Sequence, residues 1–206
     1  MMKKIYFIQF LFITLMVNGY VMGFYKEIPA PEGYEERKYL QFQIVEKINK
    51  KLEKKYHMTC VALGSSGDGC LLKAIDVSFE RCKGSISLEE NRKILFDCMQ
   101  IYLAEFNKNQ KIRRFLKNYP FEEKNVHITI HNCEKDGTTV FHPYIGTLHN
   151  LSKGISYYTY DPEDKYFKYK TEIDETYEEF YSKLKETKET QSKQSESTET
   201  KISEKI

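Results

Sequence analysis

Two long stretches of this chain place apolar residues at helical spacing along one side only. The first runs from about Tyr34 to Tyr56, and the second begins at Ser87. A helix with a single apolar stripe buries that stripe against a second layer of structure. We therefore expect two amphipathic helices that cover something else. Their stripes are Leu40, Ile44, Val45, Ile48 and Leu52 in the first, and Ile94, Leu95, Cys98, Ile101, Tyr102 and Phe106 in the second.

The second helix has clear signals at its ends. Ser87 and Glu90 have the spacing of a capping box, in which each side chain satisfies a backbone amide at the helix start. A looser stretch follows around Asn107, and Pro120 ends the unit. A third, shorter helix is predicted over residues 174–184, with its aromatic residues on one side.

The remaining apolar segments predict strands that arrive in neighbouring pairs. Turn signals separate them: the glycine-rich segment Gly64–Gly69, the pair Asp136-Gly137, and Asp161-Pro162. Paired strands indicate an antiparallel sheet, and one-sided helices indicate that they cover one of its faces. The predicted fold is therefore α+β, with an antiparallel sheet built from hairpins and helices packed on one face in two layers. The expected strands are 58–63, 71–79, 126–131, 138–141, 155–160 and 166–170.

The first residues have the pattern of a secretory signal peptide. Lysines precede an apolar run from Ile5 to Val17, which is shorter than the roughly 20 residues of a membrane span. We expect cleavage after Gly23, with an uncleaved N-terminal anchor as the alternative. The predicted organisation is a signal peptide at 1–23, a linker at 24–33, one domain at 34–184 and a disordered polar tail at 185–206. The expected location is exported, either periplasmic or secreted, with no transmembrane span after signal cleavage.

Charge and cysteine content narrow the partners and the compartment. Lys and Arg number 32 and Asp and Glu number 30, so the chain lacks the basic excess that binding of nucleic acid demands. The five cysteines lie after the signal, where an oxidising compartment favours pairing. Five cysteines allow up to two disulfides and one free thiol, and we interpret Cys98 as a buried free thiol. The sequence leaves the pairing open among Cys60, Cys70, Cys82, Cys98 and Cys133.

Two segments resemble chemical motifs but miss their requirements. Gly64 and Gly69 have the spacing of a phosphate-binding loop, yet Cys70 and Leu71 replace its lysine and hydroxyl. We interpret this segment as a mobile hairpin loop. His131 and Cys133 are two apart on a predicted strand and are the best metal-ligand pair, while His127 lies about 13 Å from His131. The alternative is that these histidines decorate the solvent side of the strand. We expect no cofactor.

Five tyrosines in the late hairpin form the candidate binding surface, and lysines are interleaved with them. Aromatic residues of this kind are enriched at protein interfaces, although the pattern also suits cross-strand aromatic pairs. We therefore expect a protein partner and leave the oligomeric state open. The candidate residues are Tyr157, Tyr158, Tyr160, Tyr166 and Tyr169.

No catalytic constellation is intact in the sequence. The expected function is an exported, non-enzymatic interaction or envelope-associated module, and the alternative is a small hydrolase or thiol enzyme that uses cysteine and histidine. Cysteine reactivity at neutral pH distinguishes the two.

Three blocks of sequence carry a resemblance. Residues Ser87–Arg92, Ile112–Phe121 and Glu175–Glu179 resemble blocks of uncharacterised exported proteins of chlamydia-like intracellular bacteria. The resemblance covers roughly residues 34–185. It implies a bacterial envelope or secreted setting, and it assigns no activity and no residue role.

Overall fold

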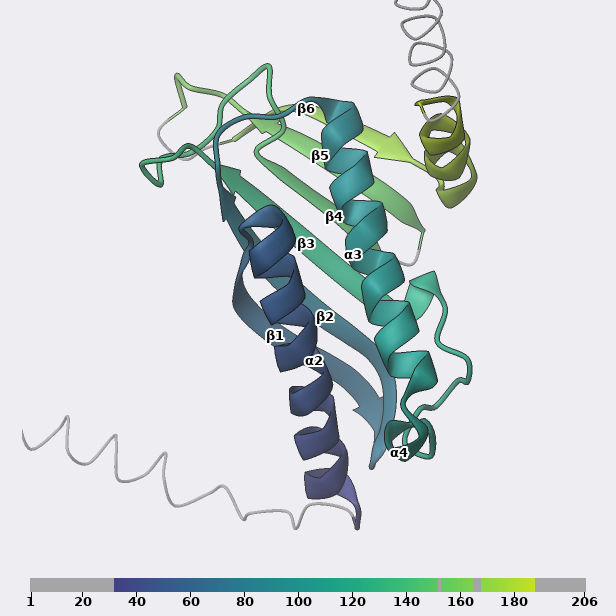
Figure 1. The fold of residues 1–206 in the computed structure, drawn as a ribbon. Coiled ribbons are helices and arrows are strands. Elements are labelled where there is room, and N and C mark those ends of the chain that lie inside the picture. The colour runs from purple at the N-terminus through teal and green to yellow at the C-terminus, as the bar shows by residue number, and fades with distance from the viewer. Residues whose placement is uncertain (1–31, 152, 165–167, 188–206) are drawn as a thin grey trace, which may run out of the picture. The chain divides into compact units, whose positions relative to one another are not determined.

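The computed structural model describes residues 32–151, 153–164 and 168–187, and it confirms the two-layer α+β fold (Figure 1). Six strands form one sheet whose spatial order follows the chain order. The strands are β1 (Thr59–Asp68), β2 (Leu71–Cys82), β3 (Val126–Cys133), β4 (Thr147–Leu151), β5 (Gly154–Tyr160) and β6 (Tyr169–Glu175). The helices are α2 (Tyr34–Tyr56), α3 (Leu88–Lys108), the short α4 (Gln110–Arg113), the 3-10 turn η1 (Glu123–Asn125) and a helix over 177–187.

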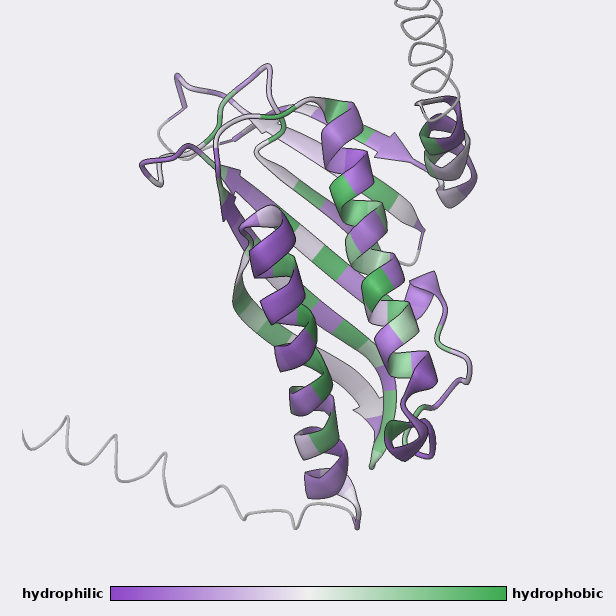
Figure 2. Ribbon diagram, in the orientation of Figure 1, coloured by the Kyte–Doolittle hydropathy of each residue, from purple (hydrophilic) through white to green (hydrophobic). Residues whose placement is uncertain are grey.

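The core lies between the helices and one face of the sheet. Figure 2 shows apolar residues on the sides of α2 and α3 that face the sheet, and alternating apolar and polar residues along the strands. The predicted stripes are confirmed, because Ile48 and Leu52 of α2 and Leu95 and Phe106 of α3 are fully buried. Strand side chains that complete this core include Ile75, Val77, Phe79, Val126, Ile128, Ile130, Leu148, Ile155 and Tyr157.

The sheet is mostly antiparallel, as expected, but it contains one parallel pair among the described strands that the sequence did not predict. Strands β2 and β3 pair in parallel, with Ile75 opposite Val126 and Cys82 opposite Cys133. Helix α3 connects these two strands, and a chain that returns across a helix enters the sheet in its original direction. The capping box of Ser87 and Glu90 that starts this helix is confirmed.

The glycine-rich segment is strand rather than a mobile loop. Strand β1 continues through it to Asp68, and Ser65 pairs with Ile75 of β2. The strands approach so closely that a Cβ atom on Gly67 would lie 2.0 Å from the Leu71 carbonyl oxygen. A glycine is therefore needed at position 67, because the backbones of β1 and β2 approach closely there. The sequence pattern alone does not distinguish such a glycine from one in a flexible loop.

The fourth strand also differs from the prediction. The turn at Asp136 and Gly137 forms, but residues 138–141 contribute only one bridge, from Thr139 to Cys133. The strand forms instead at Thr147–Leu151, where Asn150 occupies an inward position. The Asn150 amide accepts from the Ile128 N–H and donates to the Val126 carbonyl, so its burial is satisfied by hydrogen bonds. Strands are predicted from alternating apolar and polar residues, and Asn150 places a polar residue where an apolar one is expected. The pattern therefore did not reveal β4.

The end of the described chain shifts by a few residues. Strand β6 extends to Glu175, and the last helix starts after Thr176 rather than at residue 174. Thr176 and Glu179 form a capping box, with the Glu179 N–H donating to Thr176 Oγ1 and the Thr176 N–H donating to Glu179 Oε2. The helix covers residues 185–187, which were predicted as tail. Residues 188–206, the predicted signal peptide and most of the linker lie outside the described residues.

One disulfide joins Cys82 to Cys133, at directly opposed positions of β2 and β3. Cys60, Cys70 and Cys98 are not in disulfides, so one of the two bonds that five cysteines allow is present. The expectation of a buried free thiol at Cys98 is confirmed, because this side chain is fully buried in α3.

A buried ion pair ties α3 to the end of the sheet and to the last helix. Arg92 donates from Nε to Glu175 Oε1 at 3.0 Å, Lys183 donates to the same oxygen at 2.9 Å, and the Tyr157 hydroxyl donates to Oε2 at 3.0 Å. Burial favours a raised pKa for Glu175, but the hydrogen bonds from Arg92 and Lys183 outweigh it and hold the pKa below its usual range. Glu175 is therefore a buried carboxylate.

Replacing Arg92 by methionine is expected to destabilise the fold by about 3–5 kcal/mol, because it leaves the Glu175 charge buried with less compensation. Since the pKa of folded Glu175 is lowered, its contribution to stability is present above its ordinary pKa of 4.5 and is lost as the pH falls. Urea unfolding at pH 7 without reductant measures the change. The control is Lys50→Ala, which breaks the exposed Lys50–Glu46 pair and should cost below about 1 kcal/mol. Equal costs for the two variants would contradict the role of the buried pair.

Candidate binding face of the sheet

The side chains that point away from the helices form a second face of the sheet, which we call the polar face. Successive side chains of a strand point to opposite faces of the sheet. Val126, Ile128 and Ile130 of β3 face the core, so His127 and His131 lie on the polar face. The reading of these histidines as solvent-side residues is thus confirmed. The polar face consists of Asp76, Ser78, Glu80, His127, Thr129, His131, Thr147, His149, Ser156, Tyr158, Tyr160, Tyr169, Glu172 and Asp174.

The register of the strands sets these residues in rows across the sheet. One row runs from Glu80 through His131, Thr147 and Tyr158 to Glu172, with one residue from each of the strands β2 to β6. Neighbouring strands lie about 4.8 Å apart, so each member of the row contacts the next. A titratable or aromatic side chain therefore comes from nearly every strand, although these residues are far apart in the sequence.

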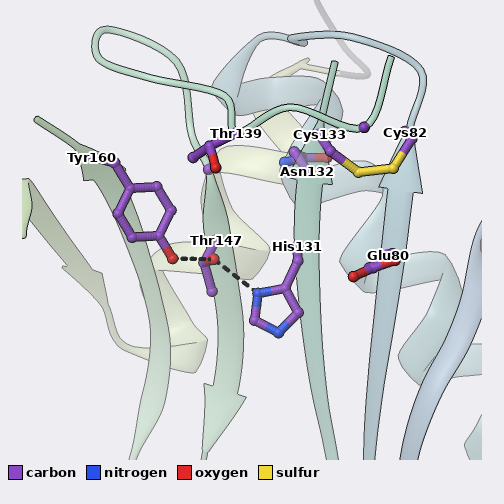
Figure 3. Close-up of a pocket in the computed structure, with 10 residues that line it drawn as sticks. Glu80, Cys82, His131, Asn132, Cys133, Thr139, Thr147 and Tyr160 are labelled. Atoms are coloured by element: carbon purple, nitrogen blue, oxygen red, sulfur yellow. Dashed lines mark hydrogen bonds between the residues drawn. A yellow bond between two sulfur atoms is a disulfide. The ribbon is translucent and has the colours of Figure 1, made fainter. Parts of the chain in front are cut away.

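A chain of hydrogen bonds fixes the middle of this face (Figure 3). Thr147 Oγ1 lies 2.7 Å from the Tyr160 hydroxyl and 3.0 Å from Nδ1 of His131. Burial lowers the pKa of His131, and the charge of Glu80 on the neighbouring strand partly opposes this effect. His131 is therefore mainly neutral at pH 7, and its ring is held in place by Thr147.

A cavity of about 380 Å³ opens beside this chain of hydrogen bonds (Figure 3). The disulfide bounds it at one end, and Thr139, from the loop after β3, contributes to its wall. Hydroxyl, imidazole and carboxylate groups thus line one depression at the ends of β2 and β3. The side chains that matter for its chemistry are Glu80, His131, Thr147 and Tyr160.

Three of the predicted tyrosines gather on the polar face. The ring centroid of Tyr169 lies 4.3 Å from that of Tyr158 and 5.6 Å from that of Tyr160, and His149 lies 5.3 Å from Tyr158. An irregularity between β5 and β6 brings them together, because it leaves Lys170 unpaired and sets Tyr169 opposite Tyr160. Tyr169 remains 57% exposed, whereas Tyr158 is covered by its neighbours.

The other two candidates do not join this group. Tyr157 is fully buried on the helix side, where its ring lies beneath Arg92 and its hydroxyl binds Glu175. Adjacent residues of a strand point to opposite faces, so Tyr157 and Tyr158 cannot both line one surface. This corrects the assignment of Tyr157 to the binding surface. Tyr166 lies outside the described residues.

The predicted metal pair does not form a ligand set. The sulfur of Cys133 is bonded to Cys82, so it has no thiolate to offer to a metal ion. Nδ1 of His131 is occupied by Thr147. Among the residues that the structure describes, no three histidine, cysteine or acidic side chains are grouped to hold a metal.

The polar face is acidic, which the sequence reasoning missed. Its carboxylates are Asp76, Glu80, Glu172 and Asp174, and none of its register-paired positions is a lysine or an arginine. Lys73 of β2 and Lys170 of β6 occupy the unpaired positions of two register irregularities, and Lys170 pairs with Asp161. Asp76 contacts Nδ1 of His127 at 2.7 Å, and Asp174 accepts from Ser156 Oγ. The signal was present in β6, where Glu172 and Asp174 flank Ile173 at strand spacing.

The thiols of Cys60 and Cys98 lie in environments that do not favour a catalytic nucleophile. Burial raises the pKa of Cys98, which is enclosed in the core, and also raises the pKa of Cys60. A raised pKa disfavours the reactive thiolate. The hydrogen bonds of the histidines run to Asp76, Thr147 and Thr159 rather than to sulfur.

Comparisons of the chain with protein-family models, curated proteins and solved structures find no match. Within the described ranges, no helix combines the length and the apolarity that a membrane crossing requires. Inference about function therefore rests on the geometry of the polar face itself.

Replacing Glu80 by glutamine is expected to lower the pKa of His131 further, because it removes the negative charge that favours the imidazolium. An NMR titration of the histidine ring carbons measures the pKa. The pKa of His131 is lower in the folded protein than the ordinary histidine value of 6.5 in the unfolded chain. As the pH falls below 6.5, the unfolded chain therefore binds a proton more readily than the folded protein does, and the fold loses stability. The control is Glu53→Gln on α2, which should leave the His131 titration unchanged. An unchanged or raised pKa in Glu80→Gln would contradict the account.

Proposed function

We propose that this protein is an exported, non-enzymatic interaction module whose polar face binds a protein segment rich in lysine and arginine. The observation that carries the proposal is a cluster of three tyrosines beside Glu172 and Asp174. The register-paired positions of the same face also hold the carboxylates of Asp76 and Glu80 and no lysine or arginine. Such a face is complementary to a cationic partner in both charge and chemistry.

The exposed ring of Tyr169 is the expected point of contact. A guanidinium or ammonium group gains attraction from an aromatic face, about 0.5–1 kcal/mol at exposed sites and more when water is excluded. Burial, together with the nearby charge of Glu172, raises the pKa of Tyr169 and of Tyr158. A negative charge that acts on both rings also attracts a cation placed over them.

Rigidity favours binding at this face. Tyr158 is held between His149 and Tyr169, and Tyr160 is hydrogen-bonded to Thr147. Side chains that are already fixed lose little conformational entropy when a partner binds. The partner therefore meets a preorganised surface built on strands rather than on loops.

Export is the setting that fits these features. The N-terminal sequence has the pattern of a secretory signal, and the Cys82–Cys133 disulfide is of the kind that persists in oxidising compartments. The resemblance to exported proteins of chlamydia-like bacteria supports a bacterial envelope or secreted location. A cationic segment of a neighbouring envelope or secreted protein is the partner that this setting offers.

The test uses an eight-residue peptide of alternating arginine and alanine with blocked ends, titrated calorimetrically into the folded protein at low and at physiological salt. We expect Tyr169→Ser and Glu172→Gln each to weaken binding at least about fivefold, since each removes one half of the cation site. The matched controls are Tyr144→Ser, an equally exposed tyrosine away from the polar face, and Glu53→Gln on α2.

Two results would overturn the proposal. One is binding of the arginine peptide that is no tighter than binding of a matched glutamate–alanine peptide. The other is equal weakening by the polar-face variants and the controls. Thermal unfolding of each variant verifies that it remains folded, so loss of binding is attributed to the surface.

A further inference from the structure

The outer edge of strand β1 is long, exposed and uncharged. Strand β1 is the terminal strand of the sheet, with β2 as its only neighbour among the described strands. Its ten residues are exposed except for Cys60, and its sequence has no charged residue before Asp68. Proteins normally protect such edges with charge, proline or short length. The opposite edge, β6, follows this rule, because it carries Lys170, Glu172 and Asp174.

Exposed apolar side chains concentrate beside this edge. Tyr39 and Phe42 of α2 are 62% and 57% exposed, and Val61 and Leu63 of β1 are 48% and 40% exposed. A hollow of about 400 Å³ lies between the two elements, with Tyr39, Phe42 and Leu63 in its lining. An apolar patch next to an open strand edge is typical of an interaction surface.

The charges of α2 indicate what covers this patch. Lys38 and Glu46 are exposed, and each is four residues, one helical turn, from Phe42. When two copies of α2 run antiparallel about a two-fold axis near Phe42, Lys38 of each copy meets Glu46 of the other, a carboxylate that also accepts from Lys50 of its own helix. The surface is thus complementary to itself in charge, as a two-fold interface requires.

We propose that two copies of this chain form a dimer through β1, with the two β1 strands pairing antiparallel about a two-fold axis near Leu63. In an edge strand, every second residue directs its N–H and C=O groups away from the sheet. Two β1 strands of ten residues each can therefore form up to about ten new backbone hydrogen bonds with each other. The apolar residues of α2 and β1 from both copies then pack around the axis. The sheet becomes continuous through both copies, and both polar faces lie on the same side.

The test is sedimentation equilibrium of the chain as its own cells export it, over a series of concentrations without reductant. We expect a monomer–dimer equilibrium, and Leu63→Lys is expected to weaken the dimer at least about tenfold, since it places a charge at the edge. The matched control is Leu151→Lys, an equally exposed leucine at the end of the interior strand β4, which should leave the equilibrium unchanged.

A charge exchange tests the orientation of the helices. Lys38→Glu alone should weaken the dimer, and the double variant Lys38→Glu with Glu46→Lys should restore it, because the opposite charges meet again across the axis. Circular dichroism verifies folding of every variant. The proposal is overturned if the protein is a monomer at its highest soluble concentration, if both leucine variants weaken the dimer equally, or if the double charge variant fails to recover.

Discussion

Burial of the apolar helix stripes against one face of the sheet is the interaction on which the rest of this structure depends. Ile48 and Leu95 from the two long helices pack into the same core as Ile75 and Ile128 from the strands. Because strand side chains alternate, filling one face with apolar residues sends the polar ones to the other. The polar face therefore follows directly from how the core is built.

The crossover through α3 makes β2 and β3 the parallel pair among the six described strands, and the disulfide joins the ends of that pair. Cys82 and Cys133 lie 51 residues apart in sequence but directly opposite each other in β2 and β3. A cross-link over a loop of this length typically stabilises a fold by about 2–4 kcal/mol. It also fixes the strand ends next to Glu80 and His131, where the cavity of the polar face opens.

The sequence predicted those elements that repeat a simple period. Both long helices, the capping box at Ser87 and the alternation in β3 were recognisable because apolar spacing alone defines them. It could not predict elements whose stability comes from distant partners. The amide of Asn150 inside β4 is satisfied by the backbone of β3. Gly67 lies so close to the Leu71 backbone that a Cβ atom would not fit there.

The candidate surface was predicted in part for the same reason. Tyr158, Tyr160 and Tyr169 come together as expected in the hairpin, but separating Tyr157 from them requires knowing which face each strand position takes. Asp76 and Glu80 join this face through the pairing of β2 with β3, which are separated in the sequence by helix α3. Composition showed a nearly neutral chain, and only the fold shows that acidic residues collect on one face.

The central claim is that the polar face, rather than the helical side, meets the partner. Site-specific photocrosslinking in the cells that make the protein tests it most directly, with the crosslinker placed at Glu172 on the polar face or at Lys93 on the exposed side of α3. The account predicts a discrete crosslinked product from position 172 and none from position 93. A product from position 93 alone would contradict it.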